Sequence, residues 1–198
     1  TDYRSVIVNA ILSLVVILFI VKNKLGEYYG LTKFQKFKEF LYFIPLLILM
    51  SVNLWGGVQI KNTSSEITFY ILFMICVGFL EEIIFRGFLF KMMAKDNVTT
   101  AIIVSSLTFG IGHIINLFNG AALIPTLIQV CYAVAGGYLF VIIFQKGKSL
   151  WPCIIAHATI NSLSIFGVEN TISTYIAPVF LILISVLYAV YLNKTIRE

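Results

Sequence analysis

The chain has 198 residues, of which 60% are apolar and only 12% are charged. A soluble domain is typically about half apolar and a quarter charged, so this composition excludes an ordinary soluble domain and predicts a membrane protein. The net charge of +5 does not indicate nucleic-acid binding, because the positive residues cluster in short loops between apolar segments, where orientation signals lie.

We expect an all-α transmembrane helical bundle in which residues 1–198 form a single membrane domain. A spanning helix needs roughly 20 apolar residues. By this criterion we expect seven spans, at 5–21, 39–58, 67–92, 98–118, 121–144, 150–166 and 172–192. The first segment lacks a small-residue cleavage site after it, which favours a transmembrane helix over a signal peptide.

The loop charges predict the orientation of the bundle. Arg4 and Lys61 lie on one side of the expected membrane. The loops on the other side hold Lys22, Lys24, Lys33, Lys36, Lys38, Lys91, Lys95, Lys146, Lys148, Lys194 and Arg197. Because cytoplasmic loops carry the excess of positive residues, we expect the N-terminus outside and the C-terminus in the cytoplasm.

Two glutamates and an arginine interrupt the third apolar segment. A charged side chain in a membrane costs on the order of 3 kcal/mol on insertion scales, so these residues need a compensating reason. Glu82 and Arg86 are four residues apart and can pair on one helical face, which is a structural role. Glu81 lies about 100° around the helix and gains no partner from it, so Glu81 is the candidate functional carboxylate.

Polar residues also interrupt two other segments. His113 and His157 are the only histidines in the chain, and Asn161 is four residues after His157, on the same helical face. With a rise of 1.5 Å per residue, Glu81, both histidines and Asn161 lie roughly 11 to 22 Å from the cytoplasmic ends of their segments. Each residue alone is explained as well by a hydrogen bond between helices, but together they predict one polar cavity.

These residue types suit water activation. Glu81 and His113 can take a proton from water, and His157 and Asn161 can stabilise an oxyanion, which amounts to amide hydrolysis without a covalent intermediate. The same Glu81, His113 and His157 could instead bind zinc and leave a position open for water. The residues alone leave both routes open. A proton-coupled transporter is a third interpretation, because buried Glu and His also form proton relays.

Three motifs, Glu81-Glu82-x-x-x-Arg86, Phe109-x-x-x-His113 and His157-x-x-x-Asn161, occur in this order on three apolar segments. They resemble the CAAX protease and bacteriocin-processing (CPBP, or Abi) family of intramembrane endopeptidases, over residues 78–161. The resemblance implies a helical membrane fold, commonly of eight spans where the sequence predicts seven, around a water-filled cavity open to the cytoplasm. It implies that Glu81 and His113 activate water, that His157 and Asn161 stabilise the oxyanion, and that Glu82, Arg86 and Phe109 support the site.

The family is named as metalloproteases, so the resemblance keeps zinc among the expected cofactors. It also implies a peptide or lipidated-peptide substrate reached within the membrane lipid. Small bacterial members are linked to bacteriocin processing or self-immunity, and the abundance of Ile, Phe, Lys and Asn is typical of a low-GC bacterium. A non-catalytic immunity protein that binds a bacteriocin is the alternative within this setting.

Overall fold

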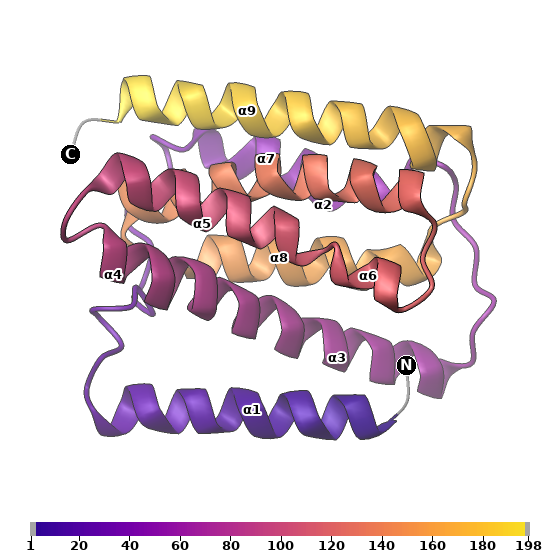
Figure 1. Cartoon of the computed structure of the whole chain (residues 1–198), viewed down its shortest axis with the longest axis horizontal. Coiled ribbons are helices and arrows are strands. Elements are labelled where there is room, and N and C mark those ends of the chain that lie inside the picture. Colours follow the sequence, from indigo (N-terminus) through magenta and orange to yellow (C-terminus); the bar gives the residue numbers. More distant parts are fainter. Residues whose placement is uncertain (1–2, 197–198) are drawn as a thin grey trace.

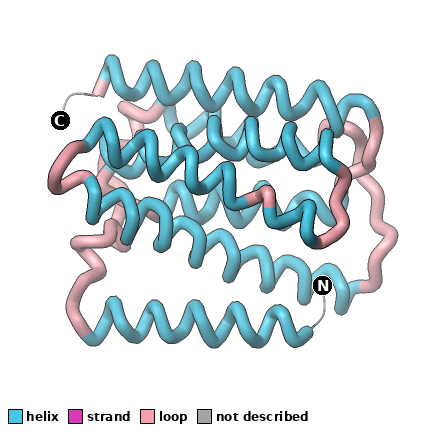
Figure 2. Tube along the Cα trace, in the orientation of Figure 1, coloured by secondary structure: helices cyan, strands magenta, loops and turns pink. Residues whose placement is uncertain are grey.

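The computed structural model describes residues 3–196, which form helices and loops without a β-strand (Figures 1 and 2). This confirms the expected all-α fold; Arg197, one of the predicted orientation residues, lies outside the described range. The main helices are α1 (Tyr3–Lys22), α2 (Ile44–Met50), α3 (Ser64–Glu82), α5 (Val98–Gly112), α7 (Leu123–Gly147), α8 (Trp151–Leu163) and α9 (Ala177–Thr195). Shorter elements are η1 (Leu41–Phe43), η2 (Val52–Leu54), η3 (Ile83–Phe90), α4 (Lys91–Met93), α6 (Ile115–Phe118), η4 (Ser164–Phe166) and η5 (Ile172–Ile176).

Within residues 3–196, five helical segments are long and apolar enough to cross a membrane. They are Tyr3–Lys22, Ser64–Met93, Val98–Phe118, Leu123–Gly147 and Ile172–Thr195, close to five of the seven expected spans. The other two expected spans form the shorter helices Leu41–Leu54 and Trp151–Phe166. The first of these is broken at its start, because Leu41, Tyr42 and Phe43 all have left-handed backbone angles. Apolar length in the sequence did not reveal that break.

The helices run roughly antiparallel in a bundle (Figure 1). The α5 helix packs on α7, α7 packs on α9, and α3 packs on α8. The α1 helix packs against α3 at one edge of the bundle. The loop after α1, the α4 turn and the C-terminal end of α9 therefore lie at the same end, on the left of Figure 1. This end carries the lysine-rich loops, and we call it the lysine-rich end.

The α3 helix begins at a capping box and ends in a wider π-helical turn. The Thr63 side chain accepts a hydrogen bond from the Glu66 backbone, and the Glu66 carboxylate accepts one from the Thr63 backbone. The π turn η3 starts at Ile83, directly after the two glutamates. Ser105 of α5 donates a hydrogen bond of 2.9 Å to the Phe85 carbonyl in this turn. Such π turns often occur at functional sites.

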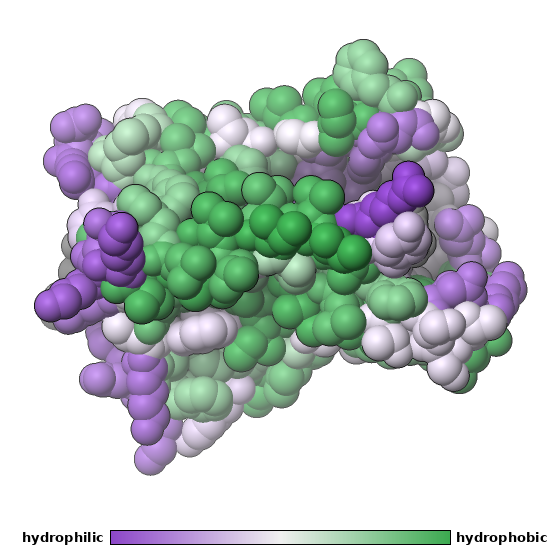
Figure 3. Space-filling view, turned by 90° about the horizontal axis from the view of Figure 1, so that it is seen from below, coloured by the Kyte–Doolittle hydropathy of each residue, from purple (hydrophilic) through white to green (hydrophobic). Residues whose placement is uncertain are grey.

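The outside of the bundle carries many large apolar side chains. Large apolar side chains remain exposed along α1, α3, α5 and α9, in addition to the buried core. Figure 3 shows apolar side chains over the middle of one face and polar side chains at both ends. A water-soluble monomer rarely exposes such a large apolar surface. The surface is that of a protein whose middle faces lipid.

Close contact between α5 and α7 depends on Gly110. A Cβ atom built on Gly110 would lie 2.7 Å from the Val134 backbone nitrogen, whereas one built on Gly112 would meet no heavy atom within 4 Å. We therefore expect Gly110→Ala to lower the free energy of unfolding by about 1–3 kcal/mol through overpacking. Gly112→Ala, in the same helix, is the matched control and should leave the melting temperature in detergent nearly unchanged. Equal melting temperatures for the two variants would contradict this packing.

Candidate active site

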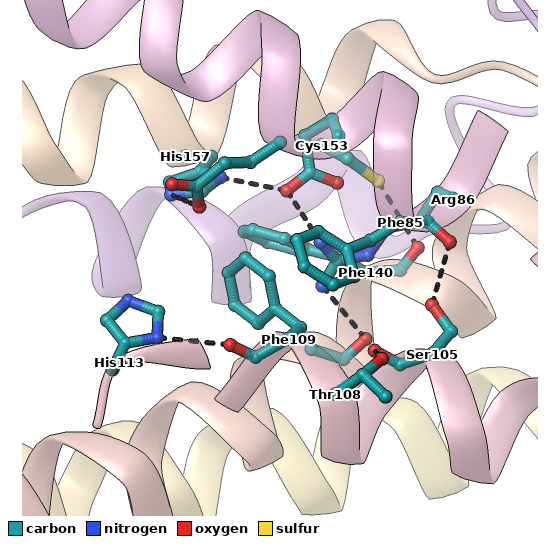
Figure 4. A network of polar contacts seen from close by, with 12 residues as sticks. Phe85, Arg86, Ser105, Thr108, Phe109, His113, Phe140, Cys153 and His157 are labelled. Atoms are coloured by element: carbon teal, nitrogen blue, oxygen red, sulfur yellow. Dashed lines mark hydrogen bonds and ion pairs between the residues drawn. The ribbon is translucent and has the colours of Figure 1, made fainter. Parts of the chain in front are cut away.

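The predicted site residues come from three parts of the chain, and Figure 4 shows two of these residues, His113 and His157, with the polar contacts around them. Glu81 and Glu82 are the last residues of α3, His113 follows α5, and His157 and Asn161 lie in α8. The approach of α3 to α8 depends on Gly78, where a Cβ would lie 2.9 Å from the Ala158 backbone nitrogen. This close packing brings the glutamates of α3 next to His157.

Glu82 and Arg86 form a fully buried ion pair. Arg86 Nη1 donates a hydrogen bond of 3.0 Å to Glu82 Oε1, and Nη2 donates one of 3.3 Å to the Gly137 carbonyl of α7. The guanidinium carbon lies 4.2 Å from the centre of the Phe109 ring and 5.5 Å from that of Phe140. Buried charge is tolerated when it is paired and surrounded by such contacts. The ion pair that the sequence predicts between Glu82 and Arg86 is therefore present, while their role in supporting the site stays a prediction.

His157 lies between the two glutamates. Its Nδ1 is 2.8 Å from Glu82 Oε1, and its Nε2 is 3.7 Å from Glu81 Oε2. Because an ionised carboxylate only accepts hydrogen bonds, Nδ1 of His157 donates to Glu82. Glu82 thus orients the imidazole and leaves Nε2 as the nitrogen that faces Glu81.

The two glutamates differ in exposure. The Glu82 side chain is completely buried, whereas 35% of the Glu81 side chain is accessible. The sequence predicts that Glu81 gains no partner from its own helix, and in the structure the imidazole of His157, on α8, lies 3.7 Å from its carboxylate. Of the two carboxylates, Glu81 is therefore the one that a substrate or a water molecule can approach.

His113 has a different environment. Its Nδ1 lies 3.1 Å from the Phe109 carbonyl oxygen, which fixes the ring against the end of α5. The Phe109 ring contacts both imidazoles, with centroid distances of 5.5 Å to His113 and 5.6 Å to His157. Within residues 3–196, no ion pair joins His113 to Glu81. Glu81 and His113 therefore make no direct ion pair, and the activation of a shared water by these two residues stays a prediction.

A cavity of about 330 Å³ borders both histidines and Asn161. It extends from His157 and Phe140 in the middle of the bundle toward Ser173 at the start of η5. Ser173 lies at the end opposite the lysine-rich end. The cavity is where the bundle brings three of the four predicted catalytic residues together, and Glu81 adjoins it through His157.

Five further polar residues that line this cavity were not singled out from the sequence: Asn53, Tyr70, Gln129, Tyr132 and Ser173. Asn53 donates a hydrogen bond of 2.6 Å to the Ile160 carbonyl of α8, and the Tyr70 hydroxyl lies 2.7 Å from the Ser164 hydroxyl. The available signal was the same one that singled out His113: a polar side chain inside an apolar segment. Asn53 and Gln129 are both polar side chains inside apolar segments, so this signal could have identified them.

The donor set does not fit a zinc ion. In the part of the chain that the structure describes, no group of three His, Cys, Asp or Glu side chains lies close enough to hold a metal. Of the three proposed ligands, Glu81 and His157 are neighbours, but His113 is held against the Phe109 carbonyl. We therefore derive no step of the chemistry through a metal.

Comparison with known proteins identifies the family. A family model of the type II CAAX prenyl endopeptidase Rce1-like proteins matches residues 63–163, just over half of the chain. The chain belongs to this family, which confirms the resemblance to CAAX proteases. All three motifs fall inside the matched region. No curated protein and no solved structure matches the chain significantly. Family membership and the long apolar helices together indicate an integral membrane protein of a protease family.

The buried pair gives a stability test. Replacing Arg86 with leucine leaves Glu82 buried without its guanidinium, so Arg86→Leu should lower the free energy of unfolding by about 3–5 kcal/mol. The double variant Glu82→Gln/Arg86→Leu removes both charges and should regain part of that loss. Denaturation in detergent measures both. An Arg86→Leu protein that is stable but inactive would contradict a structural role for this pair.

Proposed function

We propose that this protein is an intramembrane endopeptidase that hydrolyses a peptide bond with activated water, within one membrane domain formed by residues 1–198. The observation that carries the proposal is the contact between an accessible carboxylate, Glu81, and an imidazole, His157, that is oriented by a buried carboxylate beside a cavity. Family membership supports the same reaction class.

In the proposed reaction, Glu81 is the general base. It takes a proton from a water molecule as that water attacks the peptide carbonyl, and it returns the proton to the leaving amine. His113 holds the water through Nε2, since its Nδ1 is occupied by the Phe109 carbonyl. The attack of water and the return of the proton together consume one water molecule and give one product with a new carboxyl group and one with a new amino group.

The proposed oxyanion site uses the face of α8 that carries His157 and Asn161. In its protonated form, His157 donates from both ring nitrogens, so Nδ1 can remain on Glu82 while Nε2 donates to the oxyanion. The Asn161 amide, one helical turn further on, is the second donor. Such preorganised donors are typically the largest contribution to acyl-transfer catalysis. Glu82 is a positioning residue in this scheme, because it acts through His157.

The substrate is proposed to be a peptide or lipidated peptide that approaches through the membrane. The type II CAAX prenyl endopeptidase description of the family favours a prenylated C-terminal segment as the first probe. We propose a bacterial plasma-membrane setting, with bacteriocin processing or self-immunity as the process that it serves. In this setting, a purely binding immunity protein is the competing function.

Substitution of the four proposed catalytic residues tests the reaction. With a prenylated CAAX peptide in proteoliposomes, Glu81→Gln and His113→Ala should lower kcat by roughly 10²–10⁴-fold as losses of acid–base catalysis. His157→Ala and Asn161→Ala should each lower it by roughly 10²–10³-fold as losses of oxyanion donors. Glu169→Gln, an exposed carboxylate outside the cavity, is the control and should keep wild-type activity.

Full activity of Glu81→Gln or His113→Ala would refute the proposed mechanism. Exposing cells to the bacteriocin distinguishes a binding immunity protein from a peptidase. If protection survives all four substitutions while the proteins accumulate normally, the protein acts by binding and not by hydrolysis.

The direction of the cavity bears on the orientation of the protein. The positive-inside rule places the lysine-rich end in the cytoplasm. The cavity extends away from that end, toward Ser173. We therefore infer that the cavity is reached from the non-cytoplasmic face, which differs from the cytoplasmic opening that the family resemblance implies.

Cysteine labelling checks this inference. In a background in which Cys76, Cys131 and Cys153 are replaced by alanine, Ser173→Cys should react with a membrane-impermeant maleimide on intact spheroplasts. Lys148→Cys, at the opposite end, should react only after the membrane is permeabilised. The reverse pattern would restore a cytoplasmic opening.

A further inference from the structure

A second cavity lies at the lysine-rich end of the bundle, away from the candidate active site. Its volume is about 720 Å³, and its walls come from the loop after α1, from α4 and from the end of α7. Its lysines are Lys33, Lys36, Lys91, Lys95 and Lys148. Among the described lining residues, Glu27 is the only acid. We call this site the lysine cavity; it combines a defined hollow with a local excess of positive charge.

The positive charges of the lysine cavity are not neutralised within the described chain. No carboxylate of residues 3–196 lies within ion-pair distance of any of its lysines. Two of them flank one aromatic ring: the ammonium nitrogens of Lys91 and Lys95 lie 4.7 and 5.8 Å from the centre of the Tyr28 ring. Cation–π contacts orient an ammonium group but leave its charge in place. An anion between these side chains would relieve their mutual repulsion.

The wall of the cavity is held in place by hydrogen bonds between distant segments. The Leu150 backbone N–H donates to the Gly30 carbonyl at 2.7 Å, and the Ser149 hydroxyl donates to the Thr32 carbonyl at 2.6 Å. The Thr32 hydroxyl in turn donates to the Lys148 carbonyl at 3.4 Å. The loop after α1 is thereby fixed to the connection between α7 and α8. One wall of the cavity is thus held by contacts within the protein.

The lysine cavity also lies at the expected boundary between lipid and water. Lys91 begins the α4 turn at the end of the Ser64–Met93 segment, and Lys148 directly follows α7. Phe90, Val98 and Phe144 contribute apolar lining beside these ammonium groups. The positive-inside rule explains why lysines occur at this end, but it does not require so many of them to line one hollow.

We propose that the lysine cavity binds a phosphate group, with the headgroup of an anionic phospholipid as its source. Basic pockets at the cytoplasmic ends of membrane helices bind anionic headgroups, and attraction falls off within a Debye length, so a lipid held at the boundary is well placed. The apolar lining suits the glycerol and upper acyl carbons below the phosphate. This site is independent of the peptidase chemistry and would act on stability or on anchoring.

Thermal unfolding of the purified full chain in detergent tests the proposal. Phosphatidylglycerol, phosphatidylcholine and inorganic phosphate are titrated in parallel. Phosphatidylglycerol should raise the melting temperature saturably, and the effect should weaken as ionic strength rises. Phosphatidylcholine should have little effect. If inorganic phosphate produces the same saturable shift, the phosphate site stands and free phosphate is its source. If no phosphate-bearing probe stabilises the protein more than phosphatidylcholine does, the proposal fails.

Charge-matched variants localise the effect. Lys91→Gln/Lys95→Gln should weaken phosphatidylglycerol binding roughly tenfold or more. Lys33→Gln/Lys36→Gln, from a different wall, should weaken binding in the same way. This second variant carries the test if the first one folds poorly. Lys22→Gln/Lys194→Gln removes the same charge from the same end but outside the cavity, and should bind like the wild type. Equal weakening in the cavity and control variants would show a general charge effect and overturn the proposed site.

Discussion

The arrangement of the site depends on one buried carboxylate. Glu82 accepts hydrogen bonds from Arg86 on its own helix and from His157 on α8, and all three side chains are largely or wholly buried. Removal of Arg86 would leave the Glu82 charge in an apolar interior without its counter-ion, which is costly. The same carboxylate therefore ties η3 to α3, fixes the imidazole of α8, and through Arg86 holds the Gly137 carbonyl of α7. The neighbouring Glu81 remains accessible beside this fixed frame.

Local features of the site could be predicted from the sequence. The spacing of Glu82 and Arg86 predicts an ion pair within one turn, and the structure shows it even though η3 is a π turn. The approach of α3 to α8 could not be predicted, because it depends on close packing of Gly78 against Ala158, eighty residues away in sequence. For that reason the sequence could place Glu81 and both histidines around one cavity, but it did not predict that His157 contacts both glutamates.

In the fold as well, local features could be predicted from the sequence and contacts between distant segments could not. Long apolar segments predicted five helices with nearly correct ends, because helix length and hydropathy are local properties. The segment around Leu41–Leu54 was expected to be a continuous span, but left-handed backbone angles at its start shorten it. Charge position predicted a lysine-rich end, yet the cavity near His157 extends the other way, which depends on how α3, α5, α7, α8 and α9 pack together. The proposed peptidase site and the proposed phosphate site thus lie toward opposite ends of one bundle.

The central claim is that Glu82 holds His157 through its Nδ1 hydrogen. The chain has only two histidines, so solid-state NMR of the protein in bilayers with 15N-labelled histidine gives two assignable imidazoles, and a His113→Gln variant identifies each. We expect Nδ1 of His157 to carry a proton near neutral pH, and we expect its signal to shift in Glu82→Gln. An unprotonated Nδ1, or a His157 spectrum that does not respond to the loss of the Glu82 charge, would contradict this claim.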